Sequence, residues 1–326
     1  MTGPRLRILT WHVHGSYLAY LGQVRHTIYV PVRPGRPEAH AGLPPGRPWP
    51  ASLVEVPADE VSGLGLDAVL YQSERNYREH GPELLSAAQR DLPALYLEHD
   101  PPRESPTDTR HPAADDDVLV VHVTPFNDLM WDCGTSPTRV VEHGVGVPAE
   151  ARYTGELERG LVIVNHLGKR GRRLGLDVFE RARREVPLDL VGMASEELGG
   201  LGEVPPAELP RFAARYRFLF NPIRYTSLGL AVCEAMTVGL PVVGLATTEM
   251  ATAVRSGVSG YVDTDVDVLV GRMRDLLADP GLARRLGEGA RREALRRFSL
   301  ERFAADWDAV LRERVVAADV SAATVG

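Results

Sequence analysis

The sequence has only two cysteines in 326 residues, Cys133 and Cys233. They lie a hundred residues apart and lack metal-binding spacing. This argues against a disulfide framework or a zinc site and fits a reducing compartment. The N-terminus has no apolar segment typical of a signal peptide, and no stretch reaches the ~20 apolar residues that a membrane span requires. We therefore expect a cytoplasmic protein without a signal peptide or a transmembrane segment.

Positive charge is also in deficit, with 37 Lys and Arg against 44 Asp and Glu and a formal net charge of −7. Because a negative surface repels phosphate backbones at long range, nucleic acid is not expected as a partner. Any anionic ligand must be met by local groups. The 44% hydrophobic and 25% charged residues are typical of globular proteins and exclude disordered, collagenous and coiled-coil chains. At ~100–200 residues per domain, the length suggests two domains.

Short apolar, β-branched runs recur along the chain, separated by segments long enough for a crossover helix. The runs are Leu6–Trp11, Thr27–Val32, Asp67–Tyr71, Pro93–Leu97, Val118–Val123 and Arg139–His143, followed after residues 146–160 by Leu161–Val164, Leu188–Gly192, Arg217–Phe220 and Pro241–Leu245. Buried parallel strands have this composition. The pattern predicts an α/β protein with two doubly wound domains, residues 1–150 and 151–326, and a ligand site in a cleft between them.

The last third of the sequence is predicted to be helical. Apolar residues fall at helical spacing in two groups, Leu269, Met273, Leu276 and Leu277, and then Phe303, Trp307, Val310 and Leu311. We expect both groups in the core, with the last helix folding back on the first domain. Residues 33–50 and 101–117 are polar and proline-rich. Each is either a mobile wall of the site or a solvated loop.

Residues 221–244 are the most informative segment. They read as a strand end, a turn, a helix starting near residues 227–229, a stop at Gly239 and a new strand from Pro241. The predicted buried side of this helix carries Ala231, Val232, Ala235 and Met236. A helix N-terminus presents free N–H groups that suit a diphosphate. Glu234, about two turns in, is expected to accept hydrogen bonds from a ribose diol; alternatively, the helix is structural and Glu234 faces solvent.

The run from Thr226 to Val243, followed by residues 257–261, resembles the nucleotide-binding signature of GT-B glycosyltransferases, particularly the retaining family 4. That signature is a Glu, seven residues, Glu-Ala-Met/Ala, a Gly-x-Pro-Val-Val strand start and a downstream Gly-x-x-Gly. The resemblance extends over roughly residues 155–312. It implies two Rossmann-like domains facing a central cleft, the first binding an acceptor and the second a nucleotide sugar. It also implies transfer of a sugar from a nucleoside diphosphate sugar, with retention and without a metal or other cofactor.

By this resemblance, Glu234 binds the ribose hydroxyls of the donor. The backbone N–H groups near Ser227, Leu228 and Gly229 face the donor sugar and its phosphates. The position eight before Glu234, where the family has its first Glu, is occupied by Thr226. A hydroxyl can hydrogen-bond a sugar but cannot supply a negative charge, so the donor sugar and the retention of configuration stay open.

A second acid and a cationic loop complete the predicted donor site. Glu249 either substitutes for the missing first Glu or is a surface acid. Residues 165–177 place four cations between Lys169 and Arg173, and resemble the family loop whose Arg and Lys grip the donor phosphates. The family's Lys-Gly pair falls on Leu174-Gly175, so the sequence does not decide which cation binds the diphosphate. The candidates, in order of preference, are Arg173, Arg170 and Lys169, and Arg224 is a further candidate. A nucleic-acid patch and a solvated loop are the alternatives.

In the N-terminal half the resemblance rests on order along the chain. Residues 11–16 stand where GT-B proteins have a loop facing the cleft. His99 ends a strand, as does the family's active-site His, which contacts the donor sugar and phosphate. Two histidines, His12 and His14, together with Glu98, His99 and Asp100, raise the alternative of a metal site, but such spacing rarely completes one. We predict no metal.

Other polar residues have structural interpretations. The acids at 115–117 and 263–267 read as loop and helix-start residues rather than metal ligands. His122 and His143 read as core or turn histidines. The alternatives to a retaining transferase are an inverting transferase or a nucleotide-sugar epimerase of the same fold, and a non-catalytic sugar-nucleotide-binding protein. The donor base, the acceptor and the oligomeric state stay open.

Overall fold

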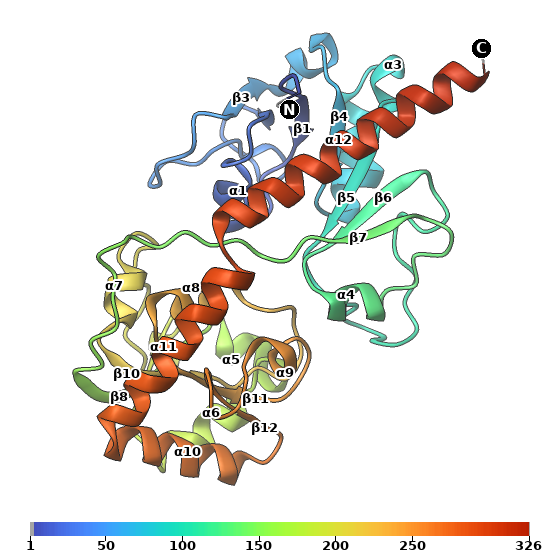
Figure 1. Cartoon of the computed structure of the whole chain (residues 1–326). Helices are drawn as coiled ribbons and strands as arrows, with labels where there is room; N and C mark the ends of the chain where they lie inside the picture. Colours follow the sequence, from blue (N-terminus) through green and yellow to red (C-terminus); the bar gives the residue numbers. More distant parts are fainter. Residues whose placement is uncertain (1–2, 326) are drawn as a thin grey trace. The chain divides into compact units, whose positions relative to one another are not determined.

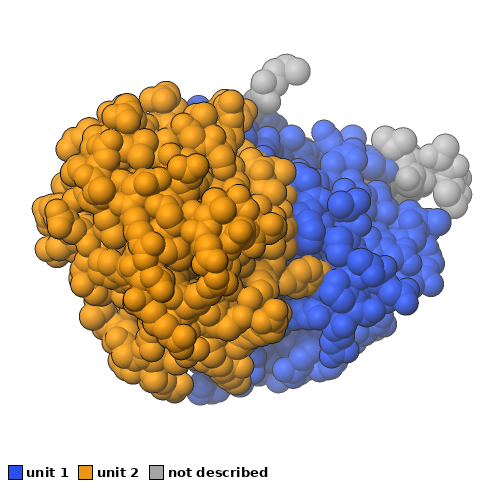
Figure 2. All heavy atoms as spheres, turned by 90° about the horizontal axis from the view of Figure 1, so that it is seen from below, with its two compact units in different colours: residues 1–142, 300–326 blue, residues 143–299 orange. Residues whose placement is uncertain are grey.

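The chain forms two compact units, each built around its own sheet. The computed structural model describes residues 3–325, and the side chains of residues 3–317. Unit 1 runs to Glu142 and resumes at Leu300, whereas unit 2 comprises His143–Ser299 (Figure 1 and Figure 2). Both sheets are parallel and carry helices, so the predicted α/β fold of two Rossmann-like, doubly wound parts is confirmed.

The sheet of unit 1 has seven strands in the order β3-β2-β1-β4-β5-β6-β7. Its strands are β1 (Arg7–Thr10), β2 (Thr27–Val32), β3 (Leu53–Pro57), β4 (Ala68–Tyr71), β5 (Ala94–Glu98), β6 (Val118–His122) and β7 (Thr138–Val140). In register, Ile8 of β1 lies between Ile28 of β2 and Ala68 of β4. The strand order reverses between β1 and β4, and open α/β sheets bind ligands at the carboxyl ends of the strands at such a point.

The helices of unit 1 include one contributed by the C-terminal segment. They are α1 (Gly15–Leu21), α2 (Gly81–Leu84), α3 (Ala87–Arg90), α4 (Pro125–Met130) and α12 (Leu300–Val325). On α12, Phe303 and Trp307 are fully buried, and the Trp307 indole N–H donates to the Tyr17 hydroxyl of α1 at 3.1 Å. Although α12 spans 26 residues, no helix within residues 3–325 combines the length and apolarity needed to cross a membrane.

Unit 2 has a five-stranded sheet in the order β12-β11-β10-β8-β9. Its strands are β8 (Leu157–Ile163), β9 (Leu188–Val191), β10 (Tyr216–Asn221), β11 (Val242–Leu245) and β12 (Gly260–Asp263). Its helices are α5 (Leu167–Arg170), α6 (Leu176–Ala182), α7 (Leu209–Ala213), α8 (Leu230–Val238), α9 (Met250–Ala253), α10 (Val266–Ala278) and α11 (Pro280–Arg297). Here the order reverses between β8 and β10, which places the switch point of unit 2 after these two strands.

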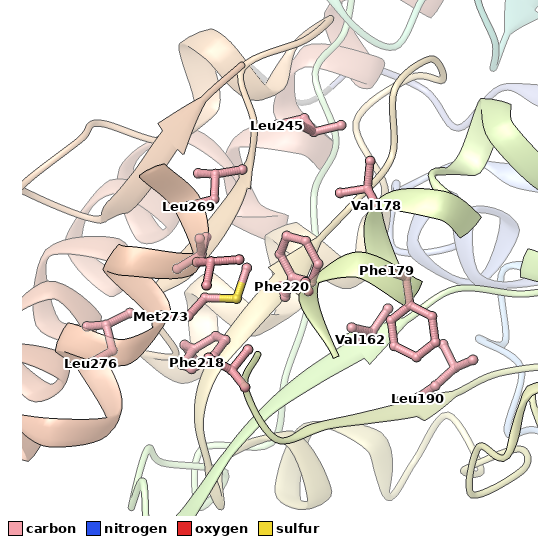
Figure 3. Close-up of a cluster of buried hydrophobic side chains, with 14 of the residues drawn as sticks. Val162, Val178, Phe179, Leu190, Phe218, Phe220, Leu245, Leu269, Met273 and Leu276 are labelled. Carbon is pink, nitrogen blue, oxygen red and sulfur yellow. The ribbon is translucent and has the colours of Figure 1, made fainter. Parts of the chain in front are cut away.

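Aromatic and branched side chains fill the core of unit 2. Figure 3 shows Phe218 and Phe220 of β10 between Phe179 of α6 and Met273 of α10, and all four are at most 2% exposed. Leu269 and Leu276 are also fully buried, and Leu277 packs against the cluster, as the helical spacing predicted. On α12 the second predicted group, from Phe303 to Leu311, is likewise buried.

The predicted strands are present, but two further strands were not predicted. Both β3 and β12 lie at the edge of a sheet, where one side of the strand has no neighbour. In β3 only Leu53 and Val56 are buried, and in β12 only Gly260 is. Continuous apolar runs, the signal used for prediction, mark strands that are covered on both faces. The signal is therefore weak in these two strands, although the other two edge strands, β7 and β9, were predicted.

Because all four tryptophans (residues 11, 49, 131 and 307) belong to unit 1, their fluorescence reports its unfolding alone. Trp307→Ala removes a fully buried indole and should lower the free energy of unfolding of unit 1 by ~3–5 kcal/mol. Val316→Ala, on the same helix at a side chain that is 58% exposed, should change it by less than ~0.5 kcal/mol. Urea titrations followed by tryptophan fluorescence measure both. Equal midpoints would show that α12 does not stabilise unit 1.

Candidate functional site

Two loops meet at the switch point of unit 2. One follows β8 and contains the cationic residues 169–173, and the other follows β10 and leads through residues 222–229 into α8. They are separated by about fifty residues of sequence but start from neighbouring strands, with Leu161 paired to Leu219. The fold therefore brings the predicted phosphate-binding loop and the predicted nucleotide-binding helix to the same edge of one sheet.

The two loops touch at Gly175. Its φ of +82° lies in the left-handed region, and a Cβ at this position would lie 1.9 Å from the carbonyl oxygen of Pro222. No other residue type fits such a contact without moving the backbone. Next to it, the backbone N–H groups of Arg224 and Tyr225 donate to the Arg173 carbonyl at 3.1 and 3.2 Å. The contact sets the distance between the loops.

An ion pair reinforces this contact. The Arg224 guanidinium donates to both carboxylate oxygens of Asp177, at 2.5 and 2.7 Å, and to the Arg172 carbonyl at 2.8 Å. Arg172 also pairs with Asp177 at 2.8 Å. The hydrogen bond from Arg224 lowers the pKa of the Asp177 carboxyl below its usual range. Arg224 and Arg172 are thus held by an acid, and their charge is partly neutralised.

The other cations of the loop have different surroundings. Lys169 and Arg170 are exposed, and among the described side chains no carboxylate forms an ion pair with either. Arg173 is half-buried. The structure thus separates the cationic run into Arg172, which is held by Asp177, and Lys169, Arg170 and Arg173, which form no ion pair with Asp177.

Helix α8 begins at Leu230, slightly later than predicted. Gly229 occupies the N-cap position with extended backbone angles and has no side chain to accept from the first N–H groups of the helix. Just before it, the Ser227 hydroxyl is buried without a hydrogen-bond partner. The buried His143 Nε2 lies 2.8 Å from the Leu228 carbonyl and fixes the approach to the helix. The start of α8 therefore keeps donor groups available for a ligand.

The predicted ribose-binding acid lies on this helix. Glu234 is half-buried on α8, between Cys233 and Ala235, which are both buried. Thr226 is half-buried in the loop that precedes the helix. The prediction that Ala231 lies on the buried side is wrong, because that residue is half-exposed and the apolar face continues instead through Cys233 and Val238.

Glu249 lies in a buried ion pair. Its carboxylate, 2% exposed, is 2.6 Å from Arg297 Nη2 of α11 and also accepts from the Thr252 hydroxyl. Removing one partner of such a pair is costly, because the other charge stays buried. The pair anchors the start of α9 to α11.

His99 follows β5 in unit 1 and belongs to a hydrogen-bond chain. Its Nε2 lies 2.9 Å from Gln72 Oε1, and Gln72 Nε2 donates to the Thr10 hydroxyl and the Trp11 carbonyl, both at 2.8 Å. Because the Gln72 oxygen only accepts, Nε2 of His99 carries the proton and Nδ1 is its acceptor atom when the ring is neutral. No sequence pattern pointed to Gln72, which lies 27 residues before His99 and belongs to no motif.

The other predicted histidines have structural surroundings. His122 is fully buried in β6, and burial lowers its pKa to about 3. His143 is buried beside Leu228, as described above. No group of three or more His, Cys, Asp or Glu arranged to hold a metal ion occurs among the residues that the structure describes.

Comparison with known proteins finds a sequence family that matches part of unit 2. Residues 193–293, which span the loop after β9 through most of α11, match the family described as Glycosyl transferases group 1. No protein with a curated description matches the chain in sequence.

Solved structures resemble the whole chain. Sucrose-phosphate synthase from Thermosynechococcus elongatus has a TM-score of 0.72 and 18% identity, with 96% of this chain and 100% of that one aligned. Anabaena HepE, solved with UDP-glucose, has a TM-score of 0.69 and 15% identity over 95% and 100%. AviGT4, a glycosyltransferase involved in avilamycin A biosynthesis, has a TM-score of 0.62 and 18% identity over 96% and 98%. The chain therefore has the GT-B glycosyltransferase fold, and the predicted resemblance is confirmed.

Gly175→Ala should separate the two loops, because the new Cβ would collide with the Pro222 carbonyl. We expect unit 2 to lose more stability than the ~1–2 kcal/mol that left-handed backbone strain alone costs, together with weaker nucleotide binding. Gly199→Ala is the matched control, since Gly199 has a similar φ of +74° with nothing within 4 Å of its Cβ position. Thermal unfolding and UDP titration compare the two variants. Equal behaviour would show that the contact at Gly175 is not needed.

Proposed function

We propose that the protein is a glycosyltransferase that moves a hexose from a nucleoside diphosphate sugar to an acceptor. Unit 2 binds the nucleotide sugar and unit 1 the acceptor. The observation that carries the proposal is the meeting of the cationic loop and the start of α8 at one switch point, within a unit whose residues 193–293 match group 1 glycosyltransferases. UDP is the proposed nucleotide, since HepE was solved with UDP-glucose.

The donor diphosphate would lie between the two loops. The N–H groups near Ser227, Leu228 and Gly229, together with the unpartnered Ser227 hydroxyl, would donate to its oxygens. Arg173, Arg170 and Lys169 would supply the positive charge that stabilises the leaving group. Arg224 would act mainly through Asp177, by holding the loops together.

The remaining donor contacts involve the ribose and the sugar. Glu234 would accept hydrogen bonds from the two ribose hydroxyls, and Thr226 would bind a hydroxyl of the transferred sugar. His99 would contact the donor sugar, with Nδ1 accepting from a sugar hydroxyl while the Nε2 proton is directed to Gln72. Glu249 is placed in the site only by its sequence position, and its ion pair with Arg297 supports a structural role instead.

Transfer breaks the bond between the anomeric carbon and the diphosphate oxygen and forms a bond from that carbon to the acceptor oxygen. With retention, the acceptor attacks the same face that the diphosphate leaves, and its hydroxyl proton passes to the leaving phosphate. The diphosphate thus acts as the base, and the step needs neither a metal nor another cofactor. Cations at the diphosphate lower the barrier because charge develops there in the transition state.

The presence of Thr226 leaves alternatives to a retaining transfer open. Without the family's first Glu, the site could invert the configuration, act as an epimerase or bind a nucleotide sugar without turnover. Proton NMR of the glycoside formed from a panel of UDP and GDP sugars distinguishes these outcomes by the anomeric coupling. Binding of donors without release of free nucleotide would instead support the non-catalytic alternative.

Glu234→Ala should weaken UDP binding by ~1–3 kcal/mol, the usual range for lost hydrogen bonds to a charged group. Isothermal titration with UDP measures the loss, and Glu288→Ala, at an exposed acid of α11, is the control. If Glu234 binds the ribose, 2′-deoxy-UDP should bind the variant and the unaltered protein with more similar affinity than UDP does. An unchanged UDP affinity in Glu234→Ala would remove this residue from the site.

His99→Ala should lower kcat about 10- to 100-fold, because a hydrogen bond to the donor would be lost in the transition state. UDP affinity should stay within about twofold, since the proposed nucleotide contacts all lie in unit 2. Steady-state release of UDP from the active donor gives kcat, and titration gives the affinity. A fall in UDP affinity at constant kcat would assign His99 to ground-state binding.

A further inference from the structure

One arginine of the proline-rich loop, residues 33–50, has no acid partner. The other two arginines of this loop are matched, Arg33 by Glu83 at 2.5 Å and Arg36 by Glu55 at 2.6 Å. Arg47 is half-buried, and among the described side chains no carboxylate pairs with its guanidinium. A half-buried cation without a counter-charge calls for an explanation.

Arg47 is also held in a fixed position. Its Nη2 donates to the Ser16 hydroxyl at 3.0 Å, and its guanidinium lies 5.4 Å over the Trp49 ring. Trp49 is itself fixed, since its indole N–H donates to the Pro44 carbonyl at 2.9 Å. The loop therefore presents Arg47 against the connection between β1 and α1, with its guanidinium plane set by stacking.

The other terminal nitrogen of Arg47 lies near Gly15, a residue without a side chain. Nη1 is buried and has no hydrogen-bond partner. A Cβ on Gly15 would lie 3.6 Å from this nitrogen and 3.1 Å from His12 Nε2. The side chains of Arg47 and His12 thus both place a nitrogen next to Gly15. Buried donors in native proteins are almost always satisfied, so an acceptor from outside the chain is expected here.

The local charge supports the same conclusion. Burial, and to a lesser extent the charge of Arg47, lowers the pKa of His12, while the backbone of Gly42 opposes the shift and His14 adds to it. No acid is among these influences. By contrast, a cavity of about 430 Å³ elsewhere in unit 1 contains matched charges, Arg78 with Glu74 and Arg110 with Asp115.

We propose that Arg47, Ser16 and His12 form a subsite for an oxyanion of the acceptor, a carboxylate or a phosphate monoester on a hydroxylated sugar. The inference rests on the proposed function, because the subsite follows β1 at the switch point of unit 1. His14 of the same connection and Tyr17 of α1 have rings that lie 4.3 and 4.9 Å from that of His99. An anion bound by Arg47 would hold the acceptor near the proposed catalytic histidine.

Three hexoses that differ only at C6 test the subsite: glucose 6-phosphate, glucuronate and glucose. Isothermal titration of the full chain, with and without saturating UDP, measures their affinities. We expect glucose 6-phosphate or glucuronate to bind at least about tenfold more tightly than glucose. The preferred anion identifies the group as phosphate or carboxylate.

Two arginine variants locate the binding. Arg47→Gln should weaken binding of the preferred anion about 10- to 100-fold and leave UDP affinity unchanged. Arg139→Gln removes the same charge from an exposed residue of β7, whose guanidinium donates to the carbonyl of its neighbour Thr138, and should change neither affinity.

Three results would overturn the inference: equal affinity for the three hexoses, no binding of either anion, or unchanged anion affinity in Arg47→Gln. These results can occur while UDP binds normally, in which case the proposed function stands and the acceptor subsite alone is wrong. A failure of UDP to bind the unaltered chain would contradict the proposed function instead. The titrations without UDP would then still decide whether Arg47 binds an anion.

Discussion

The close approach of Gly175 to the Pro222 carbonyl is the constraint on which the proposed donor site depends. A Cβ at residue 175 would lie 1.9 Å from that oxygen, so the two loops can meet only where a side chain is absent. The backbone bonds to the Arg173 carbonyl and the Arg224–Asp177 ion pair then hold the loops together. As a result, the cationic residues and the start of α8 lie at the same edge of the sheet. This arrangement does not depend on a direct contact between the cations and the helix.

Much of the fold could be predicted because buried parallel strands carry an unambiguous signal. Runs such as Val118–His122 are buried at every position, so apolar residues follow one another without a break. Two of the four edge strands, β3 and β12, lack that signal and were missed for this reason. The strand order could not be read directly from the sequence either. The strand order depends on how the crossover helices pack against the sheet. The alternation of strands and helices in the sequence indicates only the class of fold.

The segment proposed to bind the donor could be located in the sequence because its residues are close together. The turn, helix α8 and Glu234 form one continuous segment, and the helix is where the spacing placed it to within three residues. Contacts between distant residues were not predictable. Gln72 beside His99, and His143 beside Leu228, join positions that are 27 and 85 residues apart and follow no local pattern. In the sequence, Gly175 was noted only because Leu174-Gly175 stands where the family has a Lys-Gly pair. Its contact with the Pro222 carbonyl was not predicted, because a sequence does not show which backbone atom a glycine will face.

The distribution of charge explains how an acidic protein can bind an anionic donor. The net charge of −7 opposes anions at long range, but screening limits that effect to about 8–10 Å at physiological salt. Within this distance the pairing of individual cations decides the outcome. Arg172 and Arg224 share Asp177, whereas Lys169 and Arg170 have no acid partner among the described side chains. In unit 1, Arg33 and Arg36 are paired and Arg47 is not. Some of the unpaired cations of each unit thus lie in loops near the switch point of its sheet. In the proposed sites, the placement of these cations would decide anion binding more than the overall charge does.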